Sequence, residues 1–168
     1  MKINRTLAYD LPPEDARAMS CDPAFQERKC ADAGALDWNV RVTERPDGGT
    51  TISTRRTLPT TGFPSMLRKL LPAGMVSTEI IDWAATAEPD GTCTATLRVE
   101  FHGAPASMHG TIRVSPTAAG GSSITVDGEF KAGVPLIGGK VEKLAAPIIF
   151  DVIDSEQRTG RAWVADGV

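Results

Sequence analysis

The chain has 168 residues, of which 41% are hydrophobic and 23% are charged, and its formal net charge is −3. This length predicts a single domain, residues 1–168, with a hydrophobic core of its own. The lack of a basic excess argues against nucleic-acid binding, and no apolar run reaches the roughly 18 residues of a membrane span. Residues 1–10, MKINRTLAYD, lack the apolar stretch of a signal peptide. We therefore expect a cytoplasmic protein without stable membrane insertion.

The N-terminal part predicts one strand and two short helices. Residues 3–9 alternate weakly and indicate the strand. LPPEDARAMS (11–20) opens with prolines and acids, as helix N-termini do. CDPAFQERKCADAG (21–34) follows the same logic, because Asp22 is a suitable N-cap, Pro23 a suitable first helical residue and Gly34 a suitable stop.

From Leu36 onward the hydrophobic pattern has a period of two. It predicts six strands at about 36–43, 51–58, 76–87, 93–102, 108–115 and 124–132, with turns at PDGG, EPDG, GAPA and TAAGG. One face of this meander is apolar and the other is polar, which is typical of an antiparallel sheet with one face on a core.

The last predicted hairpin places two glycines opposite each other. Pairing Val114 with Ile124 also pairs Gly110 with Gly128 in the middle of the sheet. A strand glycine marks a bend or the close approach of another backbone. We favour a deliberate crease in a strongly curved sheet; a local bulge is the alternative.

Residues 136–163 form the only long helical pattern, which predicts a helix about 40 Å long at about 1.5 Å per residue. Gly138 and Gly139 would supply backbone freedom at its start, including positive φ. Pro147 would kink it, so that Ile149, Phe150 and Ile153 form a second apolar group on its back. The inner face is predicted to contain Ile137, Val141, Leu144, Ala145, Ile148, Val152, Ser155, Thr159, Ala162 and Trp163.

A straight helix does not fill the concave face of a curved sheet. Small inward residues and an aromatic content of 5% favour a cavity over a filled core. The predicted pocket residues are Trp38, Val40, Thr54, Arg56, Leu97, Val99, Gly110, Ile112, Val126, Gly128, Leu144, Ile148 and Val152.

This order of elements resembles the helix-grip fold of the START/SRPBCC superfamily, which includes polyketide cyclases and lipid-transfer domains. GTCTATLRVEFHGAPASMHGTIRVSP (91–116) and GEFKAGVPLIGGKVEKL (128–144) are similar to a bacterial family of uncharacterised members. The resemblance implies an α+β fold with a seven-stranded curved antiparallel sheet, a long C-terminal helix and a deep pocket between them. It does not fix an activity.

Arg56 is the most informative polar residue, because alternation places it on the apolar face with Ile52 and Leu58. It either reaches water at the strand end or anchors a carboxylate or other anionic headgroup. Glu79 would be its partner, but Ile80 and Ile81 point opposite ways and leave the phase of that strand open. Asp151 is expected at the solvent rim.

No other residue suggests chemistry. Strand parity places His102 and His109 on the wet face. There is no Cys/His cluster with metal-ligand spacing, no phosphate-binding glycine loop and no nucleophile elbow. The sequence therefore predicts no catalytic residue, no metal and no cofactor.

GFPSMLRKLLP (62–72) lies between strands three and four and carries a short apolar stripe formed by Phe63, Met66, Leu67, Leu70 and Leu71. It is predicted to be a short helix that either plugs one end of the grip or acts as a movable lid over the pocket.

Two main functions fit this pattern. The first is a soluble binding or transport module for a hydrophobic small molecule such as a lipid, fatty acid, isoprenoid or polyketide. The second is a cyclase or hydratase that uses a polar group in the pocket for proton transfer. The scarcity of inward titratable residues favours the binding module. An interaction protein with a vestigial pocket remains a third alternative, and the oligomeric state is not predicted.

Overall fold

The computed structural model describes residues 1–71 and 74–167 and has the predicted order of elements. The strands are β1 (Lys2–Tyr9), β2 (Asp37–Glu44), β3 (Thr50–Pro59), β4 (Gly74–Trp83), β5 (Cys93–His102), β6 (Ala106–Pro116) and β7 (Ser122–Ala132). The helices are α1 (Pro13–Cys21), α2 (Pro23–Asp32), α3 (Ser65–Arg68) and α4 (Gly138–Asp166). β4 ends at Trp83, before the predicted residue 87, because the chain bends at residues 85–86.

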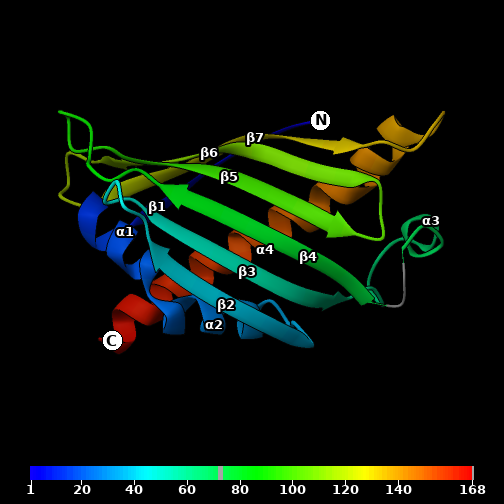
Figure 1. Ribbon diagram of the computed structural model, residues 1–168, viewed down its shortest axis with the longest axis horizontal. Coiled ribbons are helices and arrows are strands. Elements are labelled where there is room, and N and C mark those ends of the chain that lie inside the picture. The colour runs from blue at the N-terminus through cyan, green and yellow to red at the C-terminus, as the bar shows by residue number, and fades with distance from the viewer. Residues whose placement is uncertain (72–73, 168) are drawn as a thin grey trace.

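All seven strands form one antiparallel sheet in the order β1-β7-β6-β5-β4-β3-β2. The predicted β6–β7 register is confirmed: Val114 pairs with Ile124 and Gly110 with Gly128. α4 runs along the length of the sheet on one side, α3 lies beyond one end of the strands, and α1 and α2 lie toward the C-terminal end of α4 (Figure 1). This is the seven-stranded helix-grip architecture.

The local signals explain the N-terminal helices. Pro13 and Pro23 stand in the first turns of α1 and α2, where the missing amide hydrogen has no helical partner to lose. The Asp22 side chain accepts a hydrogen bond from the Ala24 amide at 2.8 Å and caps α2 as predicted.

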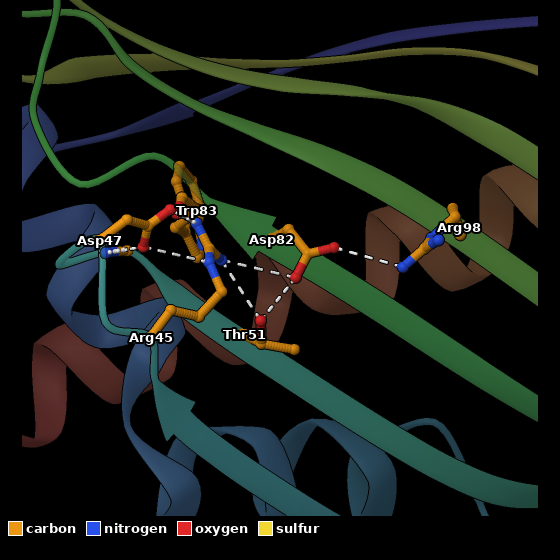
Figure 2. Close-up of polar contacts among 7 residues, drawn as sticks. Arg45, Asp47, Thr51, Asp82, Trp83 and Arg98 are labelled. Atoms are coloured by element: carbon orange, nitrogen blue, oxygen red, sulfur yellow. Dashed lines mark hydrogen bonds and ion pairs between the residues drawn. The ribbon is translucent and has the colours of Figure 1, made fainter.

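A small polar network lies on part of the sheet face turned away from α4 (Figure 2). Arg45 donates to the Trp83 carbonyl at 2.9 Å, and Thr51 donates to Asp82 at 2.6 Å. Arg98 of β5 contacts the same carboxylate at 3.4 Å. The network links the β2–β3 hairpin to β4 and β5 and leaves the opposite face free to hold the core.

The junction before α4 differs from the prediction. Neither Gly138 nor Gly139 has a positive φ; Leu136 takes it instead, at 65°, with its side chain fully exposed. Gly138 is required for another reason, because an added Cβ would lie 2.5 Å from the Ala132 carbonyl oxygen. Gly139 faces open space. Close approach to β7, rather than backbone handedness, therefore explains the first glycine.

The inner face of α4 is rotated from the predicted one. The expectation that Ile149, Phe150 and Ile153 lie on the back was wrong: Ile149 and Ile153 face the sheet. Phe150 lies under the Arg5 guanidinium of β1, 5.4 Å from its carbon to the ring centre. α4 continues through Pro147 as one helix. Arg5 also forms an ion pair with Asp154, which fixes this rotation against β1.

Two apolar clusters make up the core. The larger lies between the sheet and α4 and includes Ile81, Leu97 and Val99. The smaller joins β1, α1, α2 and the end of α4, where Phe25 and Trp163 meet edge to face with ring centres 5.6 Å apart. No helix in 1–71 or 74–167 has both the length and the apolar character needed to cross a membrane.

Candidate functional site

A cavity of about 120 Å³ lies between the sheet and α4. Most of its wall is apolar and comes from β1, β3–β7 and α4. The predicted pocket residues that line it are Arg56, Leu97, Val99, Ile112, Val126, Ile148 and Val152. Strand alternation thus located the inner wall on β5, β6 and β7.

A smaller cavity of about 70 Å³ adjoins the first near α3. The two share Met75, Phe101, Ile148 and Ile149 in their walls. Of the predicted lid residues, Phe63, Leu67, Leu70 and Leu71 line the smaller cavity, whereas Met66 only packs against the core. α3 therefore closes this end of the grip, as both the plug and the lid interpretations require.

Several predicted pocket residues lie elsewhere. Trp38 and Val40 do not line the cavity; Trp38 is 37% exposed, and the neighbouring Leu36 is 67% exposed. Trp38 pairs with Arg56 in the register, but β2 is the edge strand of the sheet. A side chain on an edge strand can point to the same face as the core residues and still lie outside the part of that face that the helices cover. The alternation pattern alone therefore placed Trp38 wrongly.

Thr54, Leu144 and the glycine pair are also absent from the cavity wall. Thr54 is fully buried beside Glu79, where Lys29 of α2 approaches the sheet. Leu144 is half-buried and packs against the core outside the cavity wall. An added Cβ at Gly110 would lie 2.8 Å from the Gly128 Cα, so this pair serves the close approach of two strands.

One end of the cavity is charged. Arg56, Glu79 and Glu156 line it, and Lys29 of α2 contacts both carboxylates, with Nζ 3.1 Å from Glu79 Oε1 and 3.1 Å from Glu156 Oε2. The Arg56 Nη2 lies 3.8 Å from Glu79 Oε2. Tyr9 lies at the same end and donates to the Glu156 carbonyl at 3.3 Å. The Glu79 side chain therefore faces the cavity, a direction that the sequence pattern left open.

The ion pairs of the cluster shift the pKa values of Glu79 and Lys29 in the directions that favour their charged forms. Burial acts to raise the pKa of Glu79, but Lys29 and Arg56 outweigh it and hold that pKa below its usual value. Burial likewise opposes the charge of Lys29, yet Glu156 and Glu79 raise its pKa. Burial, with a contribution from Glu156, raises the pKa of Tyr9 far above its usual value and keeps the phenol neutral.

Sequence reasoning missed Lys29, Glu156 and Tyr9. A signal was present in α2, whose buried residues are Phe25, Gln26, Lys29 and Cys30. A lysine within the apolar stripe of a short helix requires a carboxylate partner, and Glu79 was the unplaced candidate.

A cleft of about 390 Å³ leads toward the cavity between the end of α2, the β3–α3 loop and α4. It shares Leu58, Ile148 and Val152 with the cavity wall, and Asp151 and Arg158 stand at its rim. The expectation for Asp151 is confirmed. His102 and His109 are exposed on the outer face, as predicted.

The family model that matches this chain is described as "Protein of unknown function (DUF2505)" and covers residues 4–164. The chain belongs to the DUF2505 family. The uncharacterized protein Rv0481c of Mycobacterium tuberculosis strain H37Rv is 26% identical over 149 residues, which are 78% of this chain and 84% of that protein.

Solved structures share the fold of this DUF2505 chain. TTHA0849 of Thermus thermophilus has a TM-score of 0.63 at 15% identity, covering 98% of this chain and 99% of the other. The lipid transfer and protein localization domain of human StarD13 has a TM-score of 0.59 at 15% identity, covering 94% and 76%. The Zhui aromatase/cyclase of Streptomyces sp. R1128 has a TM-score of 0.55 at 12% identity, covering 96% and 94%. The resemblance to the helix-grip START/SRPBCC proteins is thereby confirmed at the level of the fold.

Proposed function

We propose that this protein is a soluble, cytoplasmic carrier or sensor that binds a hydrophobic small molecule between the sheet and α4. The supporting observation is the largely apolar cavity itself, which shares wall residues with a second apolar cavity and with a surface cleft. Lipids, fatty acids, isoprenoids and polyketides have the required apolar bodies. Micromolar binding corresponds to about 8 kcal/mol, which burial of about 300 Å² of apolar ligand surface would supply before association costs.

A cyclase or hydratase is the second candidate, because Tyr9, Glu79 and Glu156 reach the cavity. General acid–base catalysis works best with a group whose pKa lies near the operating pH. The pKa of Glu79 is lowered, and the pKa values of Lys29 and Tyr9 are raised, so all three lie further from pH 7 than the usual values of these groups. This electrostatic arrangement favours binding over proton transfer.

Native mass spectrometry of freshly purified protein tests the proposal directly, with a co-purified small molecule as the expected result. The second measurement is titration with N-phenyl-1-naphthylamine, an uncharged dye that fluoresces in apolar surroundings. Ile112→Trp would fill the cavity from β6 and should weaken dye binding at least about tenfold, equal to about 1.4 kcal/mol.

Thr111→Trp is the matched control, because Thr111 is the adjacent residue on the exposed outer face. It should leave dye binding unchanged. Equal dye binding by both variants, or no saturation with any apolar compound, would refute the carrier proposal and favour a protein that acts through its surface, the third alternative.

A further inference from the structure

The charged end of the cavity contains a donor without an acceptor. Arg56 is only 6% exposed and lines the cavity, and its Nε has no hydrogen-bond partner among the residues that the structure describes. The Nη2 contact with Glu79, at 3.8 Å, is an ion pair beyond hydrogen-bond reach. A buried donor left unpaired loses its hydration without compensation.

The Cys30 thiol is a weak acceptor for this donor. The Cys30 thiol of α2 lies beside the Arg56 guanidinium, and burial raises its pKa while Arg56 only partly offsets that effect. The sulfur is therefore a neutral thiol, and a thiol is a poor hydrogen-bond acceptor. Arg56 itself lines a cavity whose wall is otherwise largely hydrocarbon.

The charges around this donor already balance. Lys29 and Arg56 supply two cations, and Glu79 and Glu156 supply two carboxylates. A ligand carboxylate would add a third anion next to buried Glu79, without a free cation in the cluster to compensate for it. An uncharged oxygen would accept a hydrogen bond from the Arg56 guanidinium and leave the charge balance intact.

We propose that this end of the cavity selects a neutral amphiphile, with a ketone or alcohol oxygen that accepts a hydrogen bond from the Arg56 guanidinium and an apolar body along β5–β7 and α4. This inference rests on the proposed function and specifies the ligand class of the same site. It replaces the sequence-based expectation of an anionic headgroup. The apolar body would extend toward Met75 and Phe101, where the second cavity begins.

Isothermal titration calorimetry with four ligands of equal chain length tests the selection. The ligands are methyl octyl ketone, decanol, decane and decanoate, measured at pH 8, where decanoate is ionised. We expect the ketone and the alcohol to bind about tenfold or more tightly than decane, and decanoate to bind more weakly than either. Tightest binding of decanoate would overturn the neutral-ligand proposal.

The double variant Arg56→Met/Glu79→Gln removes the donor while keeping the cluster neutral. It should bind decane as the wild type does and lose the preference for the ketone. Arg98→Met is the control, because Arg98 lies on the outer face and contacts Asp82; it should keep the full preference.

The outcomes separate this inference from the proposed function. Decane bound as tightly as the ketone by the wild type, or a preference retained in the double variant, would overturn the Arg56 contact while the carrier proposal stands. Failure of all four ligands to bind would refute both. If the double variant does not fold, the wild-type ranking of the four ligands decides the proposal by itself.

Discussion

The buried cation of α2 offers the sharpest test of the electrostatic reasoning. Lys29 is 3% exposed and contacts both Glu79 and Glu156 at 3.1 Å. Lys29→Met keeps the length of the side chain but leaves Glu79 with Arg56 alone, at 3.8 Å. Removing one partner of a buried ion pair costs about 3–5 kcal/mol of unfolding free energy. Because Arg56 still partly compensates for the charge of Glu79, we expect a loss of about 3 kcal/mol.

The loss should depend on pH in a defined direction. In the wild type the pKa of Glu79 is depressed, so its contribution to stability is present above the unfolded pKa and disappears as pH falls through the folded pKa. Without Lys29, burial would raise the pKa of Glu79. The stability difference between wild type and variant should therefore be largest near pH 7. It should shrink as pH falls toward about 4, because Glu79 becomes protonated in the folded variant, and shrink further below that pH, because Glu79 becomes protonated in the folded wild type.

Urea denaturation and thermal melting at several pH values measure this difference. About 3 kcal/mol corresponds to a drop of about 6–12 °C in melting temperature for a domain of this size. Lys131→Met is the control, because Lys131 contacts Glu129 on the exposed surface and should change the melting temperature little. A Lys29→Met loss below about 1 kcal/mol, or one that stays constant with pH, would refute the proposed role of the cluster.

Three further substitutions test the start of α4 and the α3 end of the cavity. Gly138→Val should destabilise the fold by about 2 kcal/mol or more, because the new Cβ meets the Ala132 carbonyl, whereas Gly139→Ala should be neutral or stabilise by up to about 1 kcal/mol; equal denaturation midpoints for the two would contradict this assignment. Leu67→Ala removes a buried side chain of α3. If α3 is a plug, the variant should lose about 2–5 kcal/mol of unfolding free energy. If α3 is a movable lid, the variant should lose little stability and should release N-phenyl-1-naphthylamine faster in stopped-flow measurements.

The sequence by itself determined the elements and the register of the last hairpin. Alternation over β6 and β7 is a local property of each strand, and the short turn between them left one pairing, in which Gly110 meets Gly128. The length of α4 followed from the helical period. For the same reason the inner-wall residues Leu97, Val99, Ile112 and Val126 were identified before the fold was known.

Tertiary structure alone decided how deeply each side chain is buried and which charges meet. Trp38 shares the inner face with Arg56 but lies on the edge strand, which the sequence pattern does not reveal. The ion pairs of Arg5 with Asp154 and of Lys29 with Glu79 join residues far apart in the chain. The periodicity of the sequence indicates which residues share one face of a helix or strand. The rotation of α4 and the charged end of the cavity depend instead on contacts between elements, and these contacts exist only in the folded chain.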